Sequence, residues 1–399
     1  MLDRVINGQA RVDGEVSFSI LRDVLAESST HGLHFRAPEI RSEAHGDLGE
    51  SLVPPALKDY FVDEVTTTII QNNLLWANGR APAPRFQFAY FMLPTPCNQR
   101  CPACFMGQDK QKLPQQLVGD YFTVKELNET LQFLVEHGAK AAVYGGGGEL
   151  FAWSGAFSFL ERITEFGLTP VIFTNATLLG EQEVQRLVEL GAVVIISLRD
   201  TYEHGHDQLV GNRGGFRSAI SILNSLLEFE IQKDGRLAVE MPVTRQNSDR
   251  VLSELLPALR YLGVVPIIEE YIQITTTSAE RSRCHTFQES RAFFERARAI
   301  DHHLGYSWAL ESGTRIIGQP TCRRSLYSFA LFPSRDVLDC PSHSVRLGNL
   351  RQHPIQDILY SDRYRQHLRR FSLCPCSVFY STDDADIPAH LPMYLEKLR

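Results

Sequence analysis

A regular alternation of strand-like and helix-like segments between residues 86 and 304 is the strongest constraint on how this 399-residue chain folds. Short apolar runs typical of buried strands alternate with longer segments in which apolar residues recur at helical spacing. The expected strands are Phe86–Leu93, Ala139–Tyr144, Pro170–Thr174, Ala192–Ser197, Leu237–Val243 and Val265–Ile274, and the last is followed by a helix near Thr286–Leu304. This alternation predicts an α/β protein with a parallel sheet, whose ligands bind at the carboxyl ends of the strands.

Composition restricts the class of protein further. The chain is 43% hydrophobic, which supports a sizeable core, and no apolar run approaches the ~20 residues that a membrane helix needs. The N-terminus lacks the features of a secretory signal. The net charge of −7, with basic and acidic residues well mixed, disfavours nucleic-acid substrates. We therefore expect a soluble protein that acts on neither membranes nor nucleic acids.

Seven of the eight cysteines fall into two sets, and without an export signal they are expected to be reduced metal ligands in the cytoplasm. The first set is Cys97, Cys101 and Cys104, a C-x-x-x-C-x-x-C run after the first strand. Three thiolates at this spacing can hold three irons of a [4Fe–4S] cluster and leave the fourth iron without a protein ligand. The alternative, a zinc site, would want a fourth Cys or His nearby, and none lies within thirty residues downstream.

Three more motifs lie at expected strand ends. They are Tyr144-Gly145-Gly146-Gly147-Gly148-Glu149-Leu150, Phe173-Thr174-Asn175-Ala176-Thr177-Leu178-Leu179 and Ser197-Leu198-Arg199-Asp200. Glycines permit a close approach of the backbone to a ligand. A phosphate-binding loop is the alternative for the first motif, but neither Lys-Ser/Thr nor G-x-G-x-x-G spacing is present.

Taken together, the cysteine loop and these motifs resemble the radical S-adenosylmethionine (radical SAM) superfamily. The resemblance implies that the open iron binds the amino and carboxylate groups of SAM, which is cleaved reductively to a 5′-deoxyadenosyl radical. It also implies a partial (β/α)6 TIM-like barrel, with an open doubly wound sheet as the runner-up. The residues that the resemblance assigns to SAM are Phe105, Gly146, Gly147, Gly148, Glu149, Asn175 and Ser197.

The sequence departs from the family pattern at a few positions. Leu150 stands where Pro is usual, and Arg199 stands where an acid is expected, two residues after Ser197, the candidate for a contact with the ribose or carboxylate of SAM. Ala103 replaces a usual aromatic residue, so Phe105 is expected to cover the adenine instead. Ser197 is explained equally well as a strand-end hydroxyl.

The second set of cysteines is Cys322, Cys340, Cys374 and Cys376. Between the first two lie the strand-like segments Leu326–Phe332 and Val337–Leu338, which predict a hairpin. The arrangement resembles the twitch domain, the short form of the SPASM extension. This resemblance implies a fully ligated auxiliary [4Fe–4S] cluster that passes electrons. A structural zinc site with four cysteine ligands is the alternative.

The sequence therefore predicts three regions. Residues 1–85 form a helical N-terminal extension that either caps the barrel or docks a partner, residues 86–310 form the radical SAM core, and residues 311–399 form a small C-terminal iron–sulfur domain. A flavodoxin- or ferredoxin-type protein is the expected electron donor.

Three reactions compete once a substrate carbon has lost a hydrogen atom. Oxidation of a sugar-like or aminocyclitol-like molecule is favoured, because the auxiliary domain is short. Epimerisation would use Cys284 as a hydrogen-atom donor, although a spare thiol also packs well as a small hydrophobe. Modification of a ribosomal peptide is the third reaction.

Arg315 is a candidate for accepting or relaying a proton. A group rich in metal-ligand side chains, His204, His206 and Asp207, is expected in a loop without a metal. A noncatalytic iron–sulfur or zinc scaffold is the alternative class.

Overall fold

The computed structural model of the chain describes residues 64–93, 96–101, 104, 122–271, 283–304, 324–341 and 345–370. Its centre is a nine-stranded sheet in the order β6-β5-β4-β3-β2-β1-β7-β8-β9. The six strands predicted from the apolar runs are β1 (Phe88–Phe91), β2 (Ala141–Tyr144), β3 (Thr169–Thr174), β4 (Val193–Ser197), β5 (Leu237–Val243) and β6 (Val265–Glu270). Neighbouring members of this group pair in parallel, so the predicted parallel α/β core is confirmed.

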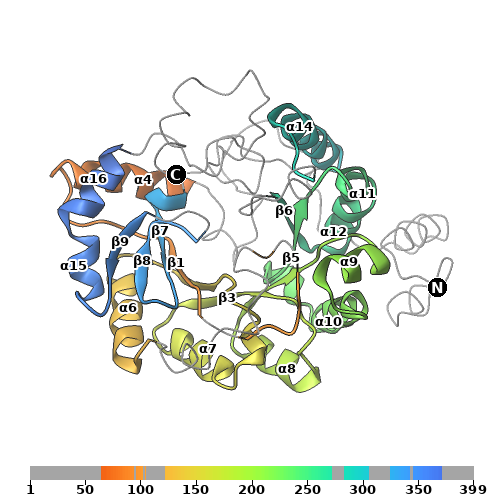
Figure 1. Ribbon diagram of the computed structural model, residues 1–399, viewed down its shortest axis with the longest axis horizontal. Helices are drawn as coiled ribbons and strands as arrows, with labels where there is room; N and C mark the ends of the chain where they lie inside the picture. Colours follow the sequence, from red (N-terminus) through yellow and green to blue (C-terminus); the bar gives the residue numbers. More distant parts are fainter. Residues whose placement is uncertain are drawn as a thin grey trace.

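Helices cover the outer side of the curved sheet (Figure 1). They are α6 (Val124–Glu136), α7 (Ala156–Glu165), α8 (Glu181–Glu189), α10 (Gly215–Glu228) and α14 (Phe287–His303), close to the segments that helical periodicity predicts. The start of α6 is fixed by a capping box, in which Thr123 and Glu126 satisfy each other's backbone N–H groups. In the described ranges no helix combines the length and the apolar character needed to cross a bilayer.

Two helical segments differ from the prediction. A helix, α9 (Glu203–Val210), follows β4 where a loop was expected. Its sequence is polar, so apolar periodicity gives it no signal. The second is the helix between β5 and β6, which divides into α11 (Ser248–Arg250), a π-helical turn at Val251–Leu255 and α12 (Leu256–Leu262). Pro257 lies at the start of α12, and its missing N–H group explains the wider turn before it.

The C-terminal hairpin extends the core sheet. Strands β7 (Ser328–Leu331) and β8 (Asp336–Leu338) pair antiparallel, as predicted, and β9 (Arg346–Asn349) adds a further antiparallel strand. Strand β7 also pairs in parallel with β1, a contact that the sequence did not predict. The hairpin is therefore held at a fixed place beside the first strand of the core.

The described part of the N-terminal extension is α4 (Glu64–Ala77), which packs on α16 (Asp362–Arg370) near α15 (Ile355–Leu359) (Figure 1). Trp76 of α4 is fully buried, and its indole lies 4.0 Å from the guanidinium of Arg365. Arg365 also donates a hydrogen bond to the Trp76 carbonyl at 2.7 Å. The C-terminus of α4 is thus capped by a cation, which its dipole favours. Residues 1–63 of the predicted N-terminal extension lie outside the described residues.

Candidate functional site

The cysteine loop lies at the carboxyl end of β1 and is held by the ends of two neighbouring units. The Glu149 N–H, after β2, donates to the Pro96 carbonyl at 2.9 Å. The Arg100 N–H donates to the carbonyl of Val210, the last residue of α9, at 2.8 Å. Both anchors use backbone groups, so they fix the course of the loop on either side of Cys97 without depending on its side chains.

A third anchor joins the loop to the end of β3 through side chains. The Asn175 amide donates to Asn98 at 3.0 Å, and the Asn98 amide donates to the Thr177 hydroxyl at 2.7 Å. Thr177 in turn donates its hydroxyl and its N–H to Asn175, at 2.6 and 3.0 Å. The Thr-Asn-Ala-Thr motif therefore holds the cysteine loop in place. The side-chain amide and oxygen of Asn175 both take part in these hydrogen bonds.

The glycine run after β2 is required by the crowding around the end of β1. A Cβ at Gly145 would lie 2.7 Å from the Tyr90 ring, and a Cβ at Gly147 would lie 1.6 Å from the Leu93 carbonyl oxygen. Gly146 adopts a φ of 101°, which only glycine adopts readily. The run brings two backbones into direct contact, just where the cysteine loop begins.

Glu149 does not present its carboxylate to solvent. The half-buried Gly148 precedes it, and the Glu149 side chain is only 2% exposed. Its oxygens accept hydrogen bonds from the Thr174 hydroxyl at 2.7 Å and from the Asn175 N–H at 2.8 Å. The carboxylate thus ties the loop after β2 to the end of β3, a role that the sequence did not suggest.

Ala176 lies in the left-handed region, with a φ of 60°. A residue with a Cβ pays a steric cost of roughly 1 kcal/mol there. The Ala176 N–H donates to the Thr174 hydroxyl at 3.0 Å, which holds the turn. Backbone strain at the end of a parallel strand is a common property of binding sites.

An ion pair connects the end of β4 to the neighbouring strand β5. Arg199 Nη1 lies 3.2 and 3.0 Å from the two carboxylate oxygens of Glu240 on β5. The Ser197 side chain, two residues before Arg199, also lowers the pKa of the Glu240 carboxyl. Burial raises the pKa of the Glu240 carboxyl, and Glu269 adds to this, while Arg199 opposes it. Arg199 therefore occupies the position of the expected acid and supplies a positive charge there.

Arg199 also interacts electrostatically with the cysteine loop. Burial disfavours its charge, but Glu240 and the thiols of Cys101 and Cys104 together raise the pKa of the guanidinium. The side chain is 33% exposed, against 9% for Glu240. A carboxylate in the middle of the apolar run Leu237–Val243 was the sequence signal that could have revealed this pair.

Helix α9 contacts the Arg199 backbone through His206. The Arg199 N–H donates to His206 Nδ1 at 3.1 Å, so the proton of this imidazole resides on Nε2. Burial, with a contribution from Arg199, lowers the pKa of His206 to about 3, so the ring stays neutral. Asp207 accepts hydrogen bonds from the N–H groups of Gly214 and Phe216. The group predicted as metal-like in composition is therefore structural at two of its three members.

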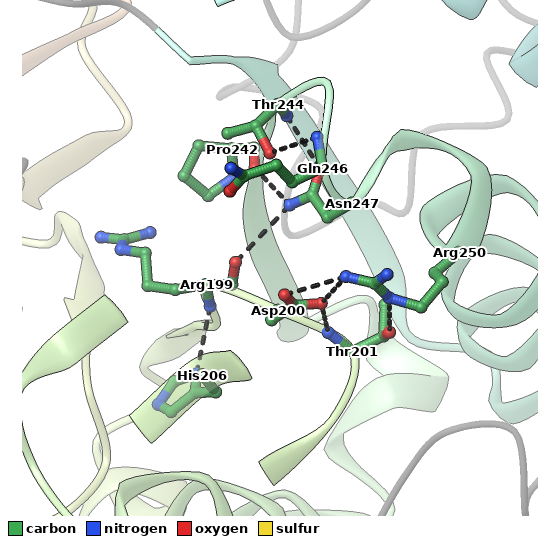
Figure 2. A network of polar contacts seen from close by, with 9 residues as sticks. All are labelled: Arg199, Asp200, Thr201, His206, Pro242, Thr244, Gln246, Asn247 and Arg250. Carbon is green, nitrogen blue, oxygen red and sulfur yellow. Dashed lines mark hydrogen bonds and ion pairs between the residues drawn. The ribbon is translucent and has the colours of Figure 1, made fainter. Parts of the chain in front are cut away.

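The same strand end carries a second ion pair (Figure 2). Arg250 Nη2 lies 2.8 and 3.0 Å from the oxygens of the buried Asp200. Asn247 donates to the Pro242 carbonyl at 3.0 Å and to the Arg199 carbonyl at 3.5 Å. This network locks the ends of β4 and β5 together, and the Arg199 side chain extends away from it (Figure 2).

Further charged side chains lie on β6 and at the start of the C-terminal region. Glu269 on β6 pairs in register with Pro242, two residues past Glu240, so both carboxylates face the same side. Arg324 Nη2 lies 3.8 Å from Glu269, and its guanidinium lies 5.5 Å from the Tyr90 ring centre. The segment that follows Cys322 in sequence therefore reaches the inner face of the core.

Cys284 lies at the carboxyl end of β5. The Arg245 N–H, two residues after that strand, donates to the Arg283 carbonyl at 3.0 Å. The thiol is half-buried, and it is not in a disulfide. The predicted position of Cys284 near the mouth of the sheet agrees with this contact, while its role as a hydrogen-atom donor stays a prediction.

Several predicted site residues lie outside the described residues. They are Phe105, Arg315, Cys322, Cys374 and Cys376. Of the second cysteine set, Cys340 is described, and it is buried two residues after the end of β8. Its neighbour Asp339 lies 3.6 Å from His367 on α16, so this end of the hairpin is fixed against the C-terminal helix.

The residues of the cysteine loop fit an iron–sulfur cluster by their chemistry. The donor set consists of three half-buried thiols, with the Arg199 cation near two of them. The Gln99 amide Nε2 is buried without a hydrogen-bond partner in the described part of the chain, and a cluster sulfide would accept such a bond. Within the same ranges no three His, Cys, Asp or Glu side chains converge on a metal position.

Comparison with known proteins shows what part of the core is similar to. Residues 94–256 match the model of the radical SAM superfamily. The sporulation killing factor maturation protein SkfB of Bacillus subtilis is 28% identical over 157 residues, which cover 39% of this chain and 35% of that protein. The chain spans about a third of the length of the curated relatives it matches.

Solved structures share the fold at low sequence identity. anSMEcpe with bound AdoMet and the Cp18Cys peptide matches with a TM-score of 0.55 and 13% identity, over 75% of this chain and 91% of that one. SuiB of Streptococcus suis bound to its precursor peptide SuiA matches with a TM-score of 0.53 and 14% identity, over 88% and 80%.

Proposed function

We propose that this chain, whose residues 94–256 match the radical SAM superfamily, is an enzyme that binds a [4Fe–4S] cluster and SAM. The observation that carries the proposal is the three-fold anchoring of the cysteine loop. It is tied by hydrogen bonds to the ends of β2 and β3 and to α9, which follows β4. Several segments of the sheet thus converge on one short run of three thiols at the edge where ligands bind.

Each group of residues has a distinct task in this proposal. Cys97, Cys101 and Cys104 hold the cluster, and the backbone of Gly146–Gly148 lines the position of the SAM methionyl group. Glu149 and Asn175 hold these segments in register, because their polar groups already bond to protein. When bound, the cluster and SAM supply a 5′-deoxyadenosyl radical that removes a hydrogen atom from a substrate carbon.

We propose a peptide as the substrate. The sequence favoured a sugar-like molecule, but the relatives described above that are named with a substrate are named with peptides. SkfB is likewise named for the maturation of a killing factor. Any short peptide encoded next to the gene can be produced together with the enzyme to test this proposal. Oxidation or crosslinking would remove two hydrogens from the peptide, and mass spectrometry would detect the loss of mass.

Electrons are proposed to enter from a flavodoxin- or ferredoxin-type donor in the cytoplasm. Cys322, Cys340, Cys374 and Cys376 are proposed to hold an auxiliary [4Fe–4S] cluster that receives the electron left after oxidation. The contact of β7 with β1 supports this role, since it anchors the hairpin that ends at Cys340 beside the first core strand.

Anaerobic reconstitution followed by incubation with SAM and dithionite tests the proposal. We expect 5′-deoxyadenosine and methionine as products, because an iron with no protein ligand leaves room for SAM. Liquid chromatography measures both products. Zinc in place of iron, with no 5′-deoxyadenosine formed, would leave a noncatalytic scaffold as the function.

Epimerisation is the second candidate, favoured by the position of Cys284 at the carboxyl end of β5. A thiol S–H is weaker than most C–H bonds, so the thiol can donate a hydrogen atom to a carbon radical. The thiyl radical that remains is reduced by the external donor, with a proton from water.

For an epimerase we expect Cys284→Ala to form 5′-deoxyadenosine but no inverted product, because no donor is left to quench the radical. In D2O the wild type should place one deuterium on the inverted carbon, as mass spectrometry would measure. Cys284→Ser is the matched variant of similar size and should behave like Cys284→Ala. Full product formation by both variants would exclude this role.

A further inference from the structure

Helix α9 links Arg199 to the cysteine loop. In its middle, His206 accepts the Arg199 N–H, and at its end the Val210 carbonyl accepts the Arg100 N–H. The same carbonyl lies 4.0 Å from the Cys101 thiol. Because a two-turn helix is stiff over this length, the backbone at Arg199 and the loop around Cys101 are held at a fixed separation.

The guanidinium of Arg199 is fixed as well. Its Nη1 bonds to both oxygens of Glu240 and to the Leu198 carbonyl, at distances between 3.0 and 3.2 Å. Its side chain extends away from the Asp200–Arg250 pair (Figure 2), and it lies within electrostatic reach of the thiols of Cys101 and Cys104. The Arg199 guanidinium is therefore held in a fixed position from which it interacts electrostatically with two of the three loop cysteines.

We propose that Arg199 sets the reduction potential of the cluster held by Cys97, Cys101 and Cys104. Reduction adds one electron from an external donor and takes up no proton, so the cluster becomes more negative by one charge. A fixed cation nearby stabilises that added charge, and a nearby anion opposes it. Glu240 thus has two effects: it holds the guanidinium in place and reduces its net field.

The inference rests on one part of the proposed function, namely that the cysteine loop holds a cluster. Potentiometric titration of the full chain, followed by electron paramagnetic resonance without SAM, tests it. The signal of this cluster is assigned by its loss from the variant with Cys97, Cys101 and Cys104 all changed to Ala. Omitting SAM separates an effect on the cluster from any effect on SAM binding.

We expect Arg199→Met to lower the equilibrium constant for reduction about tenfold, equal to 59 mV for a one-electron couple. Arg199→Lys keeps the charge and should retain most of the wild-type potential. Glu240→Gln removes the opposing anion and should raise the potential. Opposite shifts from the two partners of one ion pair are not expected from structural damage alone.

Arg250→Met is the matched control, because it also leaves a buried carboxylate, Asp200, without its arginine. We expect it to leave the potential unchanged. If Arg199→Met does not fold, the double variant with Glu240→Gln removes the unpaired carboxylate, and it should titrate below Glu240→Gln alone.

A normal cluster signal with the same potential in wild type and Arg199→Met would overturn the inference and leave the proposed function standing. An equal shift in Arg250→Met would overturn it too, because the effect would then come from general loss of structure. Absence of any iron–sulfur signal from the wild type would overturn both.

Discussion

The variant with Cys97, Cys101 and Cys104 all changed to Ala is expected to lose SAM cleavage completely. The three thiols are the proposed ligands of one cluster, and without it no iron is left open to SAM. The reconstituted wild type should carry about eight irons, and the variant about four, because the second cysteine set keeps its own cluster. Iron analysis and the 5′-deoxyadenosine assay measure the two effects together.

The complementary variant has Cys340, Cys374 and Cys376 changed to Ala. It should also lose about half of the iron, but still cleave SAM. Unchanged SAM cleavage by the loop variant would mean that the two cysteine sets have been assigned the wrong way round.

The change Gly147→Ala is expected to reduce 5′-deoxyadenosine formation on the order of a hundredfold, because reacting groups tolerate displacements of only about 1 Å. The added Cβ would meet the Leu93 carbonyl oxygen at 1.6 Å, so the end of β1 or the glycine run has to move. The Glu149 N–H, which bonds to the Pro96 carbonyl, lies two residues further on and would move with the run. The rate of SAM cleavage at matched cluster content measures the effect.

Gly180→Ala is the control for this change. Gly180 has a φ of −121°, which any residue adopts, and an added Cβ would meet only the flexible end of the Glu183 side chain, at 3.0 Å. We expect wild-type SAM cleavage from this variant. Wild-type cleavage by Gly147→Ala as well would show that the contact with Leu93 is not needed to hold the cysteine loop.

Local sequence patterns were sufficient for much of the core. The six parallel strands and most of their helices follow from apolar periodicity, which depends on neighbours a few residues apart. The cysteine loop and the glycine run could be recognised in the same way, because their chemistry resides in contiguous residues.

The pairs that complete the site could not be read in this way. Arg199 and Glu240 are 41 residues apart, and only the adjacency of β4 and β5 brings them together. Glu149 is assigned to SAM by the resemblance, and its hydrogen bond to Thr174 could not be predicted from local sequence. Helix α9 has no apolar stripe, and its His206 is buried and accepts the Arg199 N–H, a contact that depends on the tertiary fold.

The sequence by itself determined the parallel α/β core and the run of three thiols, because each is encoded in local spacing. Only the tertiary structure decided that β7 lies beside β1, that Arg199 pairs with Glu240, and that the Glu149 carboxylate bonds to the end of β3. The physical reason is the same in each case. These contacts join residues far apart in the chain, so their energy depends on how strands are ordered in the sheet and not on any local pattern.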